Sequence, residues 1–162
     1  MAELLRRGYI AALAPQGVPN ADIVVTDLDG ARLCSIQVKT RRDIGSDGGW
    51  HMKAKHEGIR VERLFYCFVD FGKSPKDSPT VHVLQSALVA TVLTTSYRRW
   101  LMTPGKKGQP HKDGPMRRLL PDYTRIFGDI DNPYPKGWLD PHRDAWHLLN
   151  LEPTDVERET EP

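Results

Sequence analysis

Hydrophobic and polar positions follow two different spacings along this chain, and the spacings separate strands from helices. Runs that are β-branched, alternating or continuously apolar predict strands over residues 9–14, 21–28, 31–40, 64–71 and 80–84. Apolar residues three and four positions apart, from Ser86 to Leu101, predict one longer helix that Pro104 ends. Shorter helices are predicted over residues 2–7, 52–57 and 144–151, whereas residues 116–127 suit either a helix or a turn.

This order of elements predicts an α/β fold, with helices layered on a mixed β-sheet. The chain has 162 residues, which suits one domain with a core of its own. The polar, glycine-rich segment 41–49 and the basic segment 104–115 are predicted loops.

Asp29-Gly30 is a strong hairpin signal between the second and third predicted strands. If these two residues form the turn, Leu28 pairs with Ala31 and every opposed pair of residue numbers adds up to 59. Asp22 then faces Gln37. Opposed residues of an antiparallel pair share one face of the sheet, and Lys39, two positions after Gln37, shares it too.

The hairpin therefore gathers a carboxylate, an amide oxygen and an ammonium group at one end. Asp22 is a hard anionic ligand for Mg²⁺ or Mn²⁺, and Gln37 and the backbone carbonyl of Val38 offer neutral oxygens. Lys39 is suited to position a water molecule for attack on phosphorus, or to stabilise the negative transition state. Ordinary solvated strand residues and a turn-capping aspartate are the alternative interpretation.

The stretch from Ala2 to Thr40 resembles the PD-(D/E)XK nuclease superfamily, in particular its Holliday-junction-resolvase-like and Mrr-like branches. There a helix ending in Gly-aromatic leads to a strand, then to an Asp strand and an (E/Q)-x-K strand. The resemblance implies a restriction-endonuclease-like mixed β-sheet with an α-β-β-β-α-β core flanked by helices. It also implies Asp22, Gln37 and Lys39 as catalytic residues, with Asp22, Gln37 and the Val38 carbonyl as metal ligands.

Three features depart from the pattern of the superfamily. Asn20-Ala21-Asp22 replaces the nominal Pro-Asp, and Gln37 replaces the nominal acid, as it does in Mrr-like members. Resolvase-like members also carry an acid on the first helix, whose counterpart would precede Met1, and Glu3 lies too near Gly8 to match it. Either the chain starts late, or the protein works without that ligand, or it is not a competent nuclease.

Basic residues and one aromatic residue outside the hairpin are candidates for contacts with nucleic acid. They are Arg41, Arg42, Trp50, Lys53, Lys55, Arg98, Arg99, Lys106, Lys107, Lys112, Arg117 and Arg118. Solvated loops, a lid and structural packing are the alternatives for these positions.

We expect a nuclease-like core over residues 1–102, a basic loop and helical extension over 103–150, and a disordered acidic tail over 151–162. Without that tail, 22 basic residues stand against 16 acidic ones, which fits a polyanionic partner or ordinary solubility. Cys34 and Cys67 lie in apolar runs, which favours buried thiols in a cytoplasmic protein. The sequence has no apolar run long enough for a membrane helix and no nucleotide-binding glycine motif.

The sequence thus predicts a metal-dependent endonuclease that acts on nucleic acid, with DNA favoured and Mg²⁺ or Mn²⁺ as cofactor. A nuclease-fold protein without catalysis, serving as a nucleic-acid- or partner-binding module, is the second hypothesis. A small structural or regulatory protein is the third. A homodimer is compatible with the first hypothesis, because cutting two strands at once requires two sites.

Overall fold

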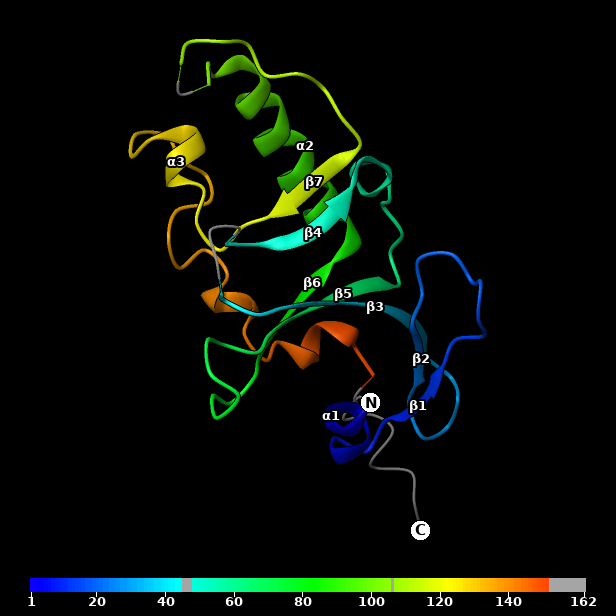
Figure 1. Ribbon diagram of the computed structural model, residues 1–162. Helices are drawn as coiled ribbons and strands as arrows, with labels where there is room; N and C mark the ends of the chain where they lie inside the picture. The colour runs from blue at the N-terminus through cyan, green and yellow to red at the C-terminus, as the bar shows by residue number, and fades with distance from the viewer. Residues whose placement is uncertain (45–47, 106, 152–162) are drawn as a thin grey trace.

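A five-stranded mixed sheet forms the centre of the protein in the computed structural model (Figure 1). The structure describes residues 1–44, 48–105 and 107–151. The strands lie in the order β1-β2-β3-β5-β6. Neighbouring strands are antiparallel except β3 and β5, which are parallel. Their bounds are Ile10–Leu13 for β1, Ile23–Thr26 for β2, Leu33–Arg41 for β3, Leu64–Asp70 for β5 and Thr80–Gln85 for β6.

Each face of this sheet is covered by different elements, because side chains alternate along the strands. Cys34 and Ile36 of β3 face a core shared with helix α1 (Ala2–Arg6) and the 3₁₀ turn η3 (Trp146–Leu149). Gln37 and Lys39 belong to the opposite face. There the core is built with the long helix α2 and with a second, two-stranded sheet. Figure 1 shows these two layers on opposite sides of the central sheet.

Helix α2 spans Ser86–Met102, and the second sheet pairs β4 (Trp50–Lys53) with β7 (Met116–Leu119). The predicted α/β fold, a mixed sheet flanked by helices, is confirmed. The long helix and all five predicted strands are present, with bounds that differ by one or two residues.

Two predicted elements differ from those observed. The first two residues of the predicted helix over 52–57 lie in strand β4, and only Ala54–Glu57 is helical, as a 3₁₀ turn (η1). Trp50 and Met52 are buried and alternate with exposed residues, which is the pattern of a strand. Residues 116–127 contain β7 followed by the short helix α3 (Thr124–Phe127).

The end of the chain also differs in detail from the prediction. Two 3₁₀ turns, η2 (Asp140–His142) and η3, replace the amphipathic helix predicted over 144–151. Leu151, which the sequence assigned to the tail, is buried in the core beside η3. The rest of the predicted tail, 152–162, lies outside the described residues. Within the described part of the chain, no helix is long and apolar enough to cross a membrane.

Candidate metal centre

The β2–β3 hairpin has the register that the sequence predicted. Ile23 pairs with Ile36 and Thr26 with Leu33, so the residue numbers add up to 59 in both pairs. The bond from the amide of Asp27 to the carbonyl of Arg32, at 3.3 Å, lies next to the turn. Residues 28–31 therefore form the turn, which is longer than the predicted two residues. Gly30 supplies the left-handed conformation in this turn, with φ of 71°.

Asp22 lies directly before β2, where the regular ladder ends. Its amide donates to the carbonyl of Ile36 at 2.8 Å, and its carboxylate oxygen Oδ2 accepts from the amide of Val38 at 2.7 Å. The amide and carbonyl of one strand residue point to the same neighbouring strand. The Val38 carbonyl is therefore directed toward the strand that Asp22 precedes, and the carboxylate itself is exposed to solvent.

Gln37 and Lys39 follow on β3, on the face that α2 and the small sheet cover. In register they lie beside Tyr66 and Phe68 of β5. Gln37 is 8% exposed, and its Oε1 has no hydrogen-bond partner within the described residues. Burial lowers the pKa of Lys39, and the cations Lys55 and Lys53 lower it further, while Asp22 opposes the shift.

The chemistry of these groups fits a hard divalent cation. Carboxylate, amide and carbonyl oxygens are the donors that Mg²⁺ accepts, together with several waters. The unpartnered Oε1 of Gln37 is one such donor. Asp22 contributes the one negative charge of the predicted set. The described residues contain no cluster of three or more His, Cys, Asp or Glu side chains suited to a metal.

Two of the predicted nucleic-acid contacts lie against each other inside the protein. Trp50 is 1% exposed, and its indole N–H donates to the carbonyl of Val69 at 2.9 Å. The guanidinium of Arg41 stacks over the Trp50 ring, 4.3 Å from its centroid, and forms an ion pair with Asp70 at 2.5 Å. Both residues support the junction between β3 and the small sheet.

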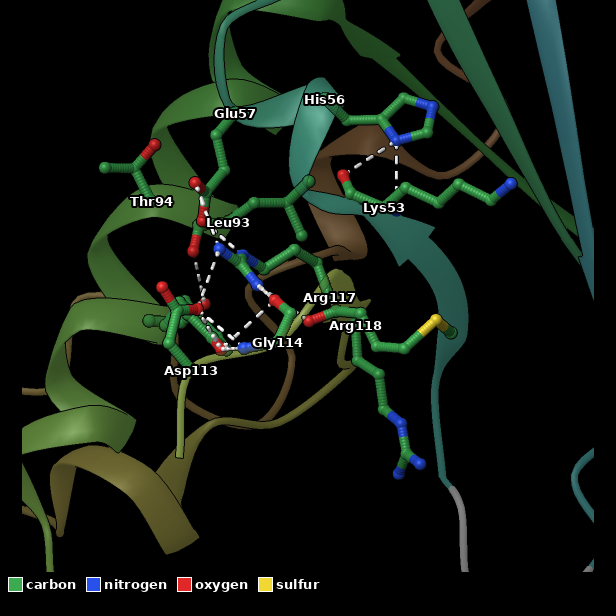
Figure 2. Close-up of polar contacts among 12 residues, drawn as sticks. Lys53, His56, Glu57, Leu93, Thr94, Asp113, Gly114, Arg117 and Arg118 are labelled. Atoms are coloured by element: carbon green, nitrogen blue, oxygen red, sulfur yellow. Dashed lines mark hydrogen bonds and ion pairs between the residues drawn. The ribbon is translucent and has the colours of Figure 1, made fainter. Parts of the chain in front are cut away.

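Arg117 is also engaged within the protein. Its side chain is 7% exposed and pairs with Glu57 of η1 at 2.5 Å (Figure 2). A second guanidinium nitrogen donates to the carbonyl of Gly114 at 2.5 Å, and the group stacks over the ring of Tyr97. Arg117 therefore joins β7, α2 and η1, and we leave it out of the proposed contact surface.

The remaining predicted basic contacts are exposed and form two groups. The first group is Arg42, directly after β3, Lys53, at the end of β4, and Lys55, in η1. Lys55 donates to the side chain of Asn20 at 2.9 Å. The second group belongs to the end of α2 and the loop after it: Arg98, Arg99, Lys107 and Lys112. Arg118 of β7 lies with Lys53 on the exposed face of the small sheet. Figure 1 shows that end of α2 far from the β2–β3 hairpin. Lys106 lies outside the described residues.

Two further polar residues lie beside the predicted centre. Tyr66 is fully buried next to Gln37, and His56 is 3% exposed, with its ring 5.9 Å from the ring of Tyr66. Burial lowers the pKa of His56, and the nearby lysines, Lys39 among them, add to this effect. No functional signal marks Tyr66 in the sequence, because it lies in a continuously apolar strand. His56 follows the basic residues Lys53 and Lys55, and no local pattern marks it as functional.

No family model matches this chain, and no curated protein matches it. Among solved structures, it is similar to the bacterial homing endonuclease I-Ssp6803I, with 16% identity and a TM-score of 0.47 over 99% of this chain and 88% of that one. It is also similar to Hjc, a Holliday junction resolvase of Archaeoglobus fulgidus. That match has 14% identity and a TM-score of 0.38 over 73% of this chain and 81% of the other.

Both of these solved structures are of nucleases. At these TM-scores we take neither an activity nor a residue role from them.

Proposed function

We propose that this protein is a metal-dependent nuclease that hydrolyses phosphodiester bonds of nucleic acid, with DNA as the favoured substrate. One observation carries the proposal: directly before the β2–β3 ladder, the Asp22 carboxylate accepts a hydrogen bond from the amide of Val38, the residue between Gln37 and Lys39. A carboxylate, neutral oxygens and an ammonium group on one strand pair suit the hydrolysis of a phosphodiester.

The roles of the residues follow from their chemistry. Asp22, the amide oxygen of Gln37 and the carbonyl of Val38 would hold Mg²⁺ or Mn²⁺, which when bound supplies Lewis-acid activation of the phosphate. The ammonium group of Lys39 orients the attacking water or stabilises charge that develops on the phosphoryl oxygens. The hydrogen bond from the Val38 amide fixes one oxygen of Asp22 and leaves the other free.

The exposed basic residues would hold the sugar-phosphate backbone without reading its sequence. Lys55 donates to the side chain of Asn20, two residues before Asp22, so it suits a phosphate next to the scissile bond. The group at the end of α2 suits a more distant part of the same nucleic acid. The two free, buried cysteines suit a reducing compartment, and we propose a cytoplasmic location.

Cleavage of supercoiled plasmid and of branched DNA, with Mg²⁺ or Mn²⁺, tests the proposal. We expect Asp22→Asn and Lys39→Met to lower the cleavage rate by about 100-fold or more, the size of effect seen when a charged group acts in the transition state. Asp29→Asn removes the same charge from the turn of the same hairpin and serves as the matched control. Nicked product indicates a single site, and linear product indicates paired sites, as in a homodimer.

An inactive wild-type protein, or an Asp22→Asn variant as active as the wild type, contradicts the proposal. The single carboxylate favours one alternative, a nuclease-fold module that binds nucleic acid without cutting it. That module would bind DNA with strong salt dependence, and chelation of divalent metal would leave its affinity unchanged.

A further inference from the structure

Three polar atoms near the candidate centre are buried without any hydrogen-bond partner in the described protein. They are Oε1 of Gln37, the hydroxyl of Tyr66 and Nε2 of His56. Their residues are 8%, 0% and 3% exposed. Leaving a buried polar atom unpaired costs about 1–3 kcal/mol, and most such atoms in folded proteins are paired with protein or with ordered water.

The three side chains lie next to one another. Gln37 pairs in register with Tyr66 across β3 and β5, so both side chains leave the sheet on the same face. The His56 ring contacts the Tyr66 ring edge-on, at 5.9 Å between centroids. Lys39 follows two positions after Gln37 on the same face of β3 and lies beside Phe68, so the proposed catalytic lysine is near this group as well.

The orientation of His56 is fixed from its other side. Its Nδ1 lies 3.1 Å from the amide and 3.0 Å from the carbonyl of Lys53, and Figure 2 shows both contacts. Nε2, on the other side of the ring, has no hydrogen-bond partner within the described residues. The η1 turn is in turn tied to the segment before β2 by the bond from Lys55 to Asn20.

Tyr66 belongs to the apolar core between the central sheet and α2, and it stacks on Phe68 at 5.8 Å. An apolar replacement at any of the three positions would remove an unpaired atom from this core. Water is the ordinary partner for buried polar atoms that the protein leaves unpaired. A shared water would give each atom a partner and would connect the tyrosine and the histidine to the amide of Gln37.

We propose that Tyr66 and His56 are positioning residues of the candidate centre. Through a buried water they fix the side-chain amide of Gln37, so that its oxygen is available to a divalent cation. This inference rests on the proposed function, because it assigns Gln37 the role of a metal ligand. Groups that orient a ligand residue commonly change metal affinity or activity by about 10- to 100-fold when they are removed.

Two variants remove one polar group each and preserve the local shape. Tyr66→Phe deletes only the hydroxyl. His56→Asn keeps an amide near Nδ1, for the contact with Lys53, and loses the group at Nε2. We expect each variant to weaken Mn²⁺ binding, measured by titration calorimetry, by about 10- to 100-fold and to lower the cleavage rate constant by a similar factor. The thermal midpoint of Tyr66→Phe should stay at or above that of the wild type.

Two further variants serve as controls. His56→Gln carries an amide near the position of Nε2, so it should retain more Mn²⁺ affinity than His56→Asn. Tyr123→Phe removes a buried hydroxyl that is fully engaged, with the amide of Leu120 at 3.1 Å and the carbonyl of Arg118 at 3.0 Å. It should lower thermal stability and leave Mn²⁺ affinity unchanged.

The outcomes separate this inference from the proposed function. Unchanged Mn²⁺ affinity in Tyr66→Phe and His56→Asn overturns the inference alone. If the wild type binds Mn²⁺ through Asp22 and cuts no nucleic acid, the proposed function fails, and the calorimetry still decides the inference. If no Mn²⁺ binding is found, or if Asp22→Asn does not abolish the binding, both the inference and the proposed function are contradicted.

Discussion

Arg117 holds three segments together through a single guanidinium group. It pairs with Glu57, donates to the carbonyl of Gly114 and stacks over Tyr97, while its side chain is almost fully buried. Removing one partner of a buried ion pair leaves the other charge uncompensated, which commonly costs about 3–5 kcal/mol.

We therefore expect Arg117→Ala to lower the free energy of unfolding by about 3 kcal/mol in urea denaturation. Arg98→Ala, an exposed arginine on α2, is the matched control, and it should change stability by less than about 0.5 kcal/mol. Equal effects of the two substitutions would contradict the structural role of Arg117.

The two cysteines are the other residues whose chemistry is set by burial. Burial raises the pKa of Cys34 to about 11 and that of Cys67 to about 12, so the reactive thiolate is scarce at pH 8. In the native protein neither thiol should react with a disulfide reagent over the time in which both react in urea. Rapid labelling of the native protein would show that one of these strands opens readily.

At the scale of elements, the hairpin was predictable because its information is local. Asp29-Gly30 marks the reversal, and the alternation of Cys34 and Ile36 with polar neighbours fixes which face is buried. The register, and with it the approach of Asp22 to β3, followed from these few residues. The pairing of β4 with β7 joins segments more than 60 residues apart, and no local signal reports it.

The same distinction applies to the candidate site. Asp22, Gln37 and Lys39 belong to one hairpin, so their grouping could be predicted. Tertiary packing brings His56 to Tyr66 and buries Trp50 and Arg117, which were predicted to contact nucleic acid. Charge and residue type alone do not distinguish a solvated arginine from one that pairs inside the protein.

The turn of the hairpin depends on one glycine. Gly30 has φ of 71°, a conformation that costs an L-residue roughly 1 kcal/mol. We expect Gly30→Ala to lower stability by about that amount. Gly58, with φ of −99°, adopts an ordinary conformation, so Gly58→Ala should be neutral or stabilising by less than about 1 kcal/mol. Thermal denaturation of both variants measures the difference, and a loss as large in Gly58→Ala would contradict the explanation.

At the scale of the whole molecule, two half-buried histidines should make stability depend on pH. Partial burial lowers the pKa of His82 and of His142 below the ordinary value of 6.5, so the unfolded state binds more protons than the folded state just below that value. Stability is then complete above pH 6.5, falls as the pH drops below 6.5, and levels off once the pH is below the lowered folded-state values.

Urea denaturation at pH 7.5 and pH 5.5 measures this dependence, and we expect lower stability at pH 5.5. His82→Gln should reduce the difference between the two pH values, whereas replacing the exposed His147 by Gln should not. A protein that is equally stable at both pH values would contradict the lowered pKa of these two half-buried histidines.

The central claim is that the hairpin holds a divalent cation at Asp22. A crystal structure of the protein soaked in Mn²⁺, with the ion located by its anomalous scattering, tests it most directly. We predict one peak within coordination distance of the Asp22 carboxylate, the amide oxygen of Gln37 and the carbonyl of Val38, with Lys39 nearby. A peak at other residues, or a hairpin without Mn²⁺ at millimolar concentration, would contradict the claim.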